Sequence, residues 1–424
     1  MRTALFTLLA TSAAVAQERA PAPATDAYAP PAAAAPAQLQ INGYADIGFA
    51  VAQGDGTSFA PGDTRIPADY GADTFATAVN SRGDVASTDS RGRFVNGFLP
   101  RSMGIGGQPS FLLNTFDVDL KYVPANAPLL LFGRLQFLPR YGGAGNETRV
   151  LVEQAFARII PFSSQELALS LGKFDSVFGI EYLENEANLR TNVTPSLIAR
   201  YTTGQSLGIK AFYRVQIPAL WAALSLNAAA TNGGTLVETL SPPDLSLSGR
   251  PIGSARLGFE LNLPALELKL GVSGMYGPRN DQHGVQVRQR AAGADVRLVI
   301  GGLSLSAEGV IISQDQGGAD KSNGLGPETV VSAFDARGAY ATLAYGMPLS
   351  DGAFRKLTPY ARYEQRHAQF EGFSAYTVQR VTLGGRLDLW DELIAKAEVL
   401  LNGELSGLPK VANNVFTSSF VYSF

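Results

Sequence analysis

Charged residues of this 424-residue chain recur at alternate positions within apolar segments, and this spacing limits the chemistry they could do. Asp117, Asp119 and Lys121 alternate with Val118 and Leu120. A period of two places the charges on one face of a strand and the apolar side chains on the other. Opposed rows of acidic and basic groups along a water-filled path can select solutes by size and charge. The spacing therefore predicts strands with one charged face and one apolar face.

Further charges occupy equivalent alternate positions in other segments. They are Arg134, Lys210, Arg214, Arg256, Glu260, Arg297 and Arg386. If these segments enclose a water-filled lumen, the charges face water and are hydrated, so they avoid a large desolvation cost. We expect these residues to line the lumen wall, together with Asp117 and Asp119.

Catalytic chemistry has little support in the sequence. The two histidines, His283 and His367, fall in predicted loops, and no G-x-S-x-G nucleophile elbow accompanies them. The aspartates between residues 52 and 110 lack EF-hand spacing, so a solvated loop is favoured over a calcium site. We expect no enzyme activity, cofactor or metal. An esterase-like or lipase-like barrel enzyme and a closed structural barrel are the alternatives.

The overall composition excludes several other classes of protein and of functional site. The chain has no cysteine, which rules out disulfides, thiolate metal sites and a cysteine nucleophile. Its formal net charge is −3, without the basic stripe that a nucleic-acid partner requires. We expect no nucleic acid among its partners.

The N-terminal region carries an export signal. Arg2 precedes a short apolar run, and Ala14-Val15-Ala16 has the small-x-small form of a signal-peptidase site. Residues 1–16 are therefore predicted to be a cleaved signal peptide. Residues 17–38 are dominated by alanine and proline, which predicts a disordered periplasmic leader.

Alternation of apolar and polar residues continues from residue 39 to the end and predicts about sixteen strands, of which 148–160 is the most ambiguous. No later segment offers about 18 uninterrupted apolar residues, so no transmembrane helix is expected. Short and long connections alternate strictly along the chain. The long ones span 52–110, 175–203, 232–253 and 313–336, with a further one from His367 to Tyr376. All long loops thus fall at one rim.

This pattern predicts an all-β fold, a transmembrane antiparallel up-and-down β-barrel over residues 39–424. Soluble sandwiches also alternate, but Greek-key crossings do not segregate loops in this way. The barrel must close because no water satisfies an edge strand in hydrocarbon. About sixteen strands leave an aqueous lumen, and the apolar face then points outward to lipid.

The chain ends in alternating residues that include Phe420 and Tyr422 and stop at Phe424. This ending resembles the terminal strand of Gram-negative outer-membrane proteins. The resemblance implies an outer-membrane location, with these three aromatic residues read by the barrel-assembly machinery, and it implies lipopolysaccharide and other outer-membrane lipids as neighbours.

The segment Gly172-Lys173-Phe174-Asp175-Ser176-Val177-Phe178-Gly179 and the residues that follow it resemble porins of the phosphate-selective type (O and P) and their relatives. In those proteins the loop after the fifth strand folds into the pore as a constriction. The resemblance implies the same for 175–203, and it also implies a homotrimer that passes small hydrophilic solutes.

The residues expected at the constriction come from that loop and from the facing wall. They are Glu181, Glu184, Glu186 and Arg190 on the loop, with Lys121, Arg134 and Arg214 on the wall. Acids and bases are mixed here, whereas the phosphate-selective relatives are rich in lysine. We therefore expect a passive diffusion channel with an inward-folded constriction loop and weak charge selectivity.

Overall fold

The computed structural model describes residues 37–52, 110–125, 127–138, 149–162, 166–184, 186–203, 205–232, 251–280, 286–315, 333–370, 375–406 and 414–424. The predicted signal peptide, nearly all of the leader, His283 and most of the loops at 52–110, 232–253 and 313–336 lie outside these residues.

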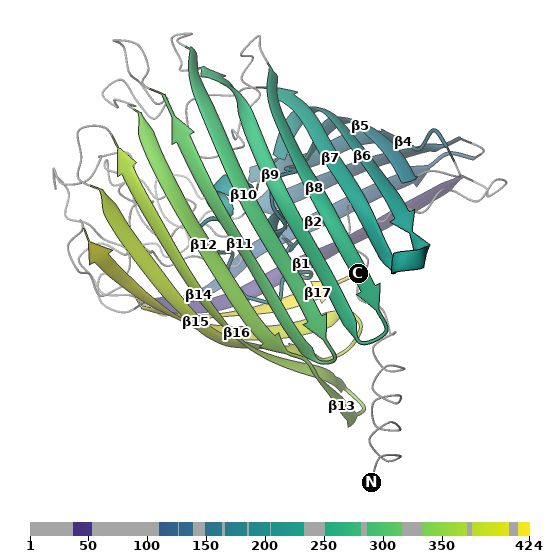
Figure 1. Cartoon of the computed structure of the whole chain (residues 1–424). Coiled ribbons are helices and arrows are strands. Elements are labelled where there is room, and N and C mark those ends of the chain that lie inside the picture. The colour runs from purple at the N-terminus through teal and green to yellow at the C-terminus, as the bar shows by residue number, and fades with distance from the viewer. Residues whose placement is uncertain are drawn as a thin grey trace.

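One antiparallel sheet of seventeen strands forms the described part of the chain (Figure 1). Nearly every strand pairs with its neighbours in sequence, as expected for an up-and-down meander. The strands are β1 Gln38–Ala52, β2 Ser110–Val123, β3 Leu129–Leu138, β4 Arg149–Ile159, β5 Glu166–Asp175, β6 Gln205–Ile217, β7 Ala222–Asn232, β8 Pro251–Leu263, β9 Leu266–Asn280, β10 Gln286–Ile300, β11 Leu303–Gln314, β12 Phe334–Tyr345, β13 Met347–Asp351, β14 Phe354–Phe370, β15 Tyr376–Asp388, β16 Leu393–Ser406 and β17 Val415–Ser423.

The sheet closes on itself. β1 pairs with β2 along one edge and with β17 along the other, from Tyr44 opposite Ser423 to Ala52 opposite Val415. β12 and β13 are separated by Gly346 alone, and both pair with β14. They therefore act as one interrupted wall strand, and the barrel has sixteen strands around its circumference, as the sequence predicts.

Connections differ in length between the two rims. Pro264-Ala265 and Gly301-Gly302 are two-residue turns, and the short η2 helix (Pro218–Leu220) connects β6 to β7 at the same rim. The strand ends that lead to the long connections all lie at the opposite rim. This segregation confirms the loop pattern read from the sequence.

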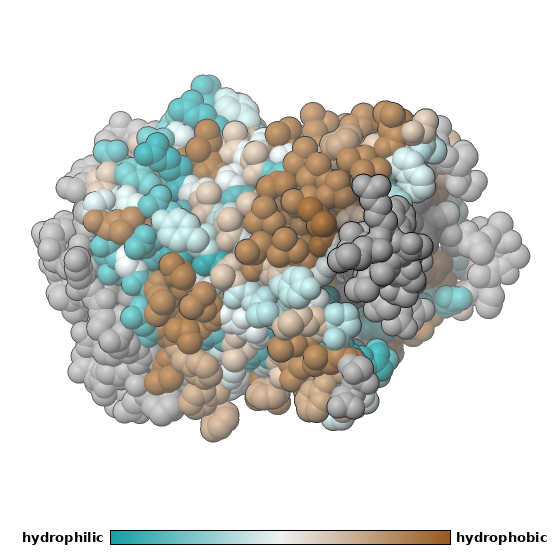
Figure 2. All heavy atoms as spheres, turned by 60° about the horizontal axis from the view of Figure 1, so that its bottom comes forward, coloured by the Kyte–Doolittle hydropathy of each residue, from teal (hydrophilic) through white to brown (hydrophobic). Residues whose placement is uncertain are grey.

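The outer face of the wall is apolar. Residues at alternate positions of successive strands are exposed, among them Ile41, Leu171, Ile209, Leu257 and Val272. Figure 2 shows apolar side chains gathered over the outer surface. Among the described residues, no helix has the length and apolar character needed to cross a membrane. The phase of the alternation therefore agrees with an apolar face directed outward.

Candidate pore constriction

The segment between β5 and β6 folds into the interior of the barrel. It includes the 3-10 helix η1 (Glu181–Glu184) and the short helix α3 (Ala199–Thr202). We call residues 176–184 and 186–203 the inner loop. It leaves the wall between β5 and β6 and bonds to β11, β14 and β16 farther around the barrel, and to β1, so it crosses the lumen.

Two positions of the Gly172–Gly179 motif require glycine, one within β5 and one where the chain enters the barrel. Gly172 has φ +135°, and a Cβ atom there would lie 2.2 Å from the carbonyl oxygen of Ala155. Gly179 has φ +73°, and its Cβ would collide with the carboxylate of Glu308. Side chains other than glycine are strained at both positions. The motif thus provides the turn that starts the inner loop.

Three wall carboxylates accept hydrogen bonds from backbone N–H groups of the inner loop. Glu308 on β11 accepts from Ile180 (3.2 Å) and Glu181 (3.0 Å). Glu364 on β14 accepts from Leu197 at 2.6 Å.

Glu398 on β16 makes the largest set of these contacts. It accepts from the N–H groups of Val193 (2.9 Å) and Thr194 (3.0 Å), and also from the Thr194 hydroxyl. The Tyr360 hydroxyl donates to the same carboxylate at 2.8 Å. Hydrogen bonds to an ionised acceptor are stronger than neutral ones, so Glu398 is a principal anchor of the loop.

Wall cations donate to the carbonyl groups of the same loop. The Lys396 ammonium lies 2.6 Å from the carbonyl oxygen of Ala187 and 3.1 Å from that of Asn192. Arg386 reaches three consecutive carbonyls, those of residues 188 to 190. Arg362 donates to the Thr194 carbonyl at 2.8 Å. Wall charges of both signs therefore hold the loop backbone.

The opposite side of the loop contacts an acidic cluster on β1 to β4. Glu186 forms an ion pair with Arg134 and accepts a hydrogen bond from the Tyr44 hydroxyl at 2.7 Å. The carboxylates of Asp117, Glu153 and Glu186 lie within 4.8 Å of one another. Arg134 also binds Asp119 through two nitrogens, at 2.6 and 2.8 Å.

Burial of this cluster corrects the expectation that all inner-face charges are hydrated. The Arg134 side chain is only 2% exposed and Asp117 is fully buried. The inner loop covers both. Arg134 is paired with Asp119 and Glu186, whereas Asp117 accepts a hydrogen bond from the Thr115 hydroxyl at 2.8 Å. A buried charge is tolerated when it is paired in this way.

Part of the interior is also apolar, which the simple inside-polar pattern does not predict. Phe178, Ile198 and Tyr201 of the inner loop pack against inward side chains of β8 to β15, such as Val310 and Val378. These inward apolar residues lie in the half of the barrel nearest the long loops. They form a dry contact because the loop, and not water, fills the space beside them.

Two of the expected constriction residues make hydrogen bonds within the loop. Glu181 accepts from the Ser196 N–H at 2.6 Å and from the Ser196 hydroxyl at 2.5 Å. Burial raises the pKa of Glu181, while the Ser196 hydrogen bonds oppose that rise. Arg190 donates to the Val193 carbonyl at 2.9 Å, and burial lowers the pKa of its guanidinium. Both residues therefore shape the loop.

Glu184 and Arg297 are the loop–wall ion pair that meets water. They lie 2.8 Å apart, and their side chains are 33% and 41% exposed. Water can therefore reach both charges, unlike those of Arg134 and Glu186. This pair joins η1 to β10.

Other predicted wall residues form ion pairs across the wall, between side chains of different strands. Arg214 lies between Glu166 (3.1 Å) and Glu260 (2.6 Å), so it contacts the wall and not the inner loop. Arg256 binds Asp295 through two nitrogens, at 2.9 and 2.5 Å.

The predicted lysines lie apart from each other. Lys210 on β6 is buried over the Phe174 ring, at 5.2 Å from its centroid. Lys121 lies on the face of β2 that carries Asp119, closer to the short-turn rim, and is partly exposed.

His367 corrects a loop assignment. It lies within β14, where its Nδ1 atom is 2.9 Å from the Thr377 hydroxyl, and the connection to β15 begins only after Phe370. The chain end lies at the barrel seam, where Phe424 exchanges two backbone hydrogen bonds of 3.0 Å with Gly43. Phe420, Tyr422 and Phe424 are exposed on the outer face.

Known structures share this architecture. No family model and no curated protein matches the sequence. An anion-selective porin from Comamonas acidovorans aligns with a TM-score of 0.52 at 8% identity, over 92% of this chain and 100% of that one. The fold is that of the outer-membrane porins.

Two further porin-fold structures align over similar lengths. The outer-membrane channel DcaP of Acinetobacter baumannii has a TM-score of 0.51 at 10% identity, over 92% of this chain and 98% of that one. A loop-deletion mutant of OmpT, an outer-membrane protein of Vibrio cholerae, has a TM-score of 0.51 at 12% identity, over 92% and 100%. At sequence identities this low, the structural similarity shows that the fold is shared.

Sequence reasoning missed several anchors of the inner loop, chiefly Glu308, Glu364, Arg362, Lys396 and Glu398. Alternation already places Lys396 and Glu398 on the polar face of their strand. The sequence feature that could have identified these anchors is an inward-facing charge in the middle of a strand. Such a charge either faces water or binds another group inside the barrel.

Proposed function

We propose that this protein is an outer-membrane porin, a passive diffusion channel for small hydrophilic solutes or ions with weak charge selectivity. The observation that carries the proposal is an inner loop bonded across the lumen of a closed barrel, with a water-exposed pair of opposite charges, Glu184 and Arg297, between loop and wall. Opposite charges at one narrow point favour neither sign of ion strongly.

The structural neighbours support the proposal, since they include a porin and an outer-membrane channel. The resemblance of Gly172–Gly179 to porins of the phosphate-selective type supports a place near that group and a homotrimeric assembly. Lysine enrichment is lacking around the inner loop, so a preference for phosphate is not part of the proposal.

Reconstitution of the purified protein in a planar bilayer tests the function. We expect discrete conductance steps and a reversal potential close to zero in a salt gradient. A strong preference for either ion would contradict weak selectivity.

A closed structural barrel is the second candidate, favoured by the burial of many inward residues at the depth of the inner loop, such as Asp117, Lys210 and Lys396. A folded, heat-modifiable protein that gives no conductance steps would favour it over the porin.

Single substitutions at the exposed pair are expected to shift ion preference in opposite directions. Glu184→Gln should favour anions and Arg297→Gln should favour cations, because each leaves one charge uncompensated. A unit charge about 8 Å from a passing ion contributes roughly 0.5 kcal/mol in water, or about a twofold change in permeability ratio. Reversal potentials in a tenfold potassium chloride gradient would measure this change in the permeability ratio.

Glu392→Gln serves as the control, because Glu392 is exposed in the short connection between β15 and β16, away from the inner loop. If the control shifts the ratio as much as Glu184→Gln does, the pair does not control selectivity.

A further inference from the structure

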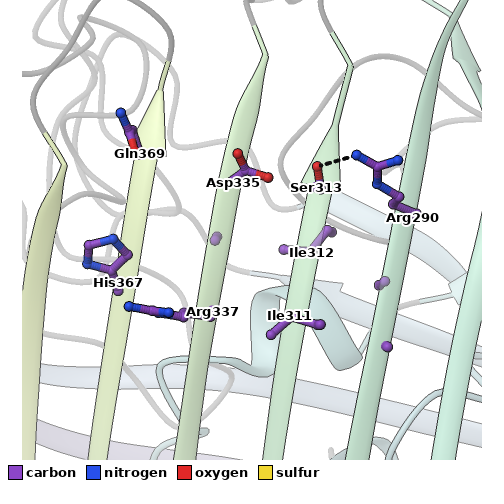
Figure 3. A pocket seen from close by; sticks show the side chains of 11 residues that line it. Arg290, Ile311, Ile312, Ser313, Asp335, Arg337, His367 and Gln369 are labelled. Atoms are coloured by element: carbon purple, nitrogen blue, oxygen red, sulfur yellow. Dashed lines mark hydrogen bonds between the residues drawn. The ribbon is translucent and has the colours of Figure 1, made fainter.

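A pocket of about 460 Å³ lies on the outer face of the wall, near the ends of β10, β11, β12 and β14 that lead to the long loops (Figure 3). Its polar lining consists of Arg290, Ser313, Asp335, Arg337, His367 and Gln369. Ile311 and Ala292 are exposed beside them and give it an apolar floor. Charges on the lipid-facing side of a barrel require an explanation, because such residues are costly in hydrocarbon.

Depth in the membrane accounts for the arginines. Strand pairing aligns Arg337 with Ile311 and His367, and Arg290 with the exposed Tyr276. Along β12, eight residues separate Arg337 from the exposed Tyr345 near the short-turn rim, about 26 Å at 3.3 Å per residue. A strand tilt of roughly 40° reduces this to about 20 Å along the membrane normal, comparable with the apolar band of such barrels. That band is about 25 Å tall, so Arg337 lies within about 5 Å of its far edge, from where a long arginine side chain reaches the head-group level.

The charge of the pocket favours an anion. Arg290 is 66% exposed, and its contacts are long: 3.4 Å to the Ser313 hydroxyl and 3.9 Å to the carboxylate of Asp315. An exposed ion pair of this length contributes little, so the guanidinium can bind another anion. Arg337 is exposed on the same face, and Asp335 is the one carboxylate in the pocket lining. Guanidinium groups bind phosphate through paired hydrogen bonds.

We propose that this pocket binds the phosphate group of a membrane lipid in the leaflet at the long-loop rim. Arg290 and Arg337 hold the phosphate, while an acyl chain lies against Ile311 and Ala292. Below the pocket, the outward positions Ala294, Gly309 and Ala339 are paired across three strands. Their small side chains leave a shallow surface on which the chain can continue. The inference requires the barrel to lie in an outer membrane but does not require it to conduct.

Native mass spectrometry of the full-length folded protein in detergent tests the site. The probes are bis-phosphorylated lipid A, its fully dephosphorylated form and inorganic phosphate. The wild-type protein should retain the phosphorylated lipid, whereas the double variant R290Q/R337Q should bind it about tenfold more weakly, since two charge-assisted contacts are lost. Arg355→Gln is the control, because Arg355 is also exposed but pairs with Asp391 at the short-turn rim.

Each other outcome contradicts the proposal. Equal lipid binding by the wild type and the double variant would show that the two arginines do not bind the lipid. Equal retention of the dephosphorylated lipid would show that the phosphate group is not what the pocket recognises. Inorganic phosphate that binds as tightly as the lipid would indicate a free-anion site. A double variant that changes oligomeric state while its lipid binding is unchanged would identify the pocket as a contact between copies. Heat-modifiability in gels confirms that each variant is folded.

Discussion

Glu398→Ala is expected to release the inner loop and raise single-channel conductance about threefold or more, because a sixteen-strand barrel without an obstruction leaves a wide aqueous channel. The change removes the acceptor for two backbone N–H groups and one hydroxyl of the inner loop. Charge-assisted hydrogen bonds contribute roughly 1.5–3 kcal/mol each, so the anchor loses about 5 kcal/mol. Lys396 and Arg362 also lose a neighbouring carboxylate. Conductance in planar bilayers would measure the result.

A matched control and a conservative variant make the Glu398 experiment specific. Glu267→Ala removes another inward carboxylate, one that pairs with Lys269 at 2.9 Å and is well exposed. Conductance should then stay close to that of the wild type. Glu398→Gln keeps one carbonyl acceptor and should have an intermediate effect. The second readout is tryptic cleavage after Arg190, which is buried in the anchored loop. Unchanged conductance together with unchanged cleavage in Glu398→Ala would show that Glu398 does not hold the loop.

The wall of this barrel follows from local patterns, which is why the sequence predicts it well. A period of two assigns each residue of a strand such as β8 to the lipid face or the inner face without knowledge of its partners. Turn residues such as Gly301, with φ +57°, mark the short rim. The predicted sixteen strands, their antiparallel order and the side of the long loops all depend on such short-range information.

Contacts of the inner loop depend on long-range information and could not be predicted in the same way. Thr194 and Glu398 are 204 residues apart, and the pattern of each segment alone does not indicate that they meet. Arg134 illustrates the consequence: its inward direction was predicted, but its burial beneath Glu186 depends on where the loop lies. The phase of a strand therefore predicts direction, and only the fold determines whether an inward charge meets water, a partner or the loop.

The apolar outer wall leads to a depth-dependent prediction for Leu257. This side chain is 58% exposed at the middle of β8, between the outward-facing Leu226 of β7 and Val272 of β9. Leu257→Arg places a charge near the centre of the hydrocarbon and is expected to lower the free energy of unfolding by about 2–4 kcal/mol. Unfolding by guanidinium chloride in phosphocholine vesicles, followed by tryptophan fluorescence, would measure the change.

Leu263→Arg is the matched control, because Leu263 lies on the same face of β8 at its short-turn end and is 41% exposed. At that depth an arginine reaches the interface, so its cost should be about 0–1 kcal/mol. Equal costs at the two positions would mean that the outer face of β8 does not span a bilayer. A gradient in cost from Leu257 to Leu263 is specific to lipid, because a soluble barrel would place both substitutions in water and tolerate them alike.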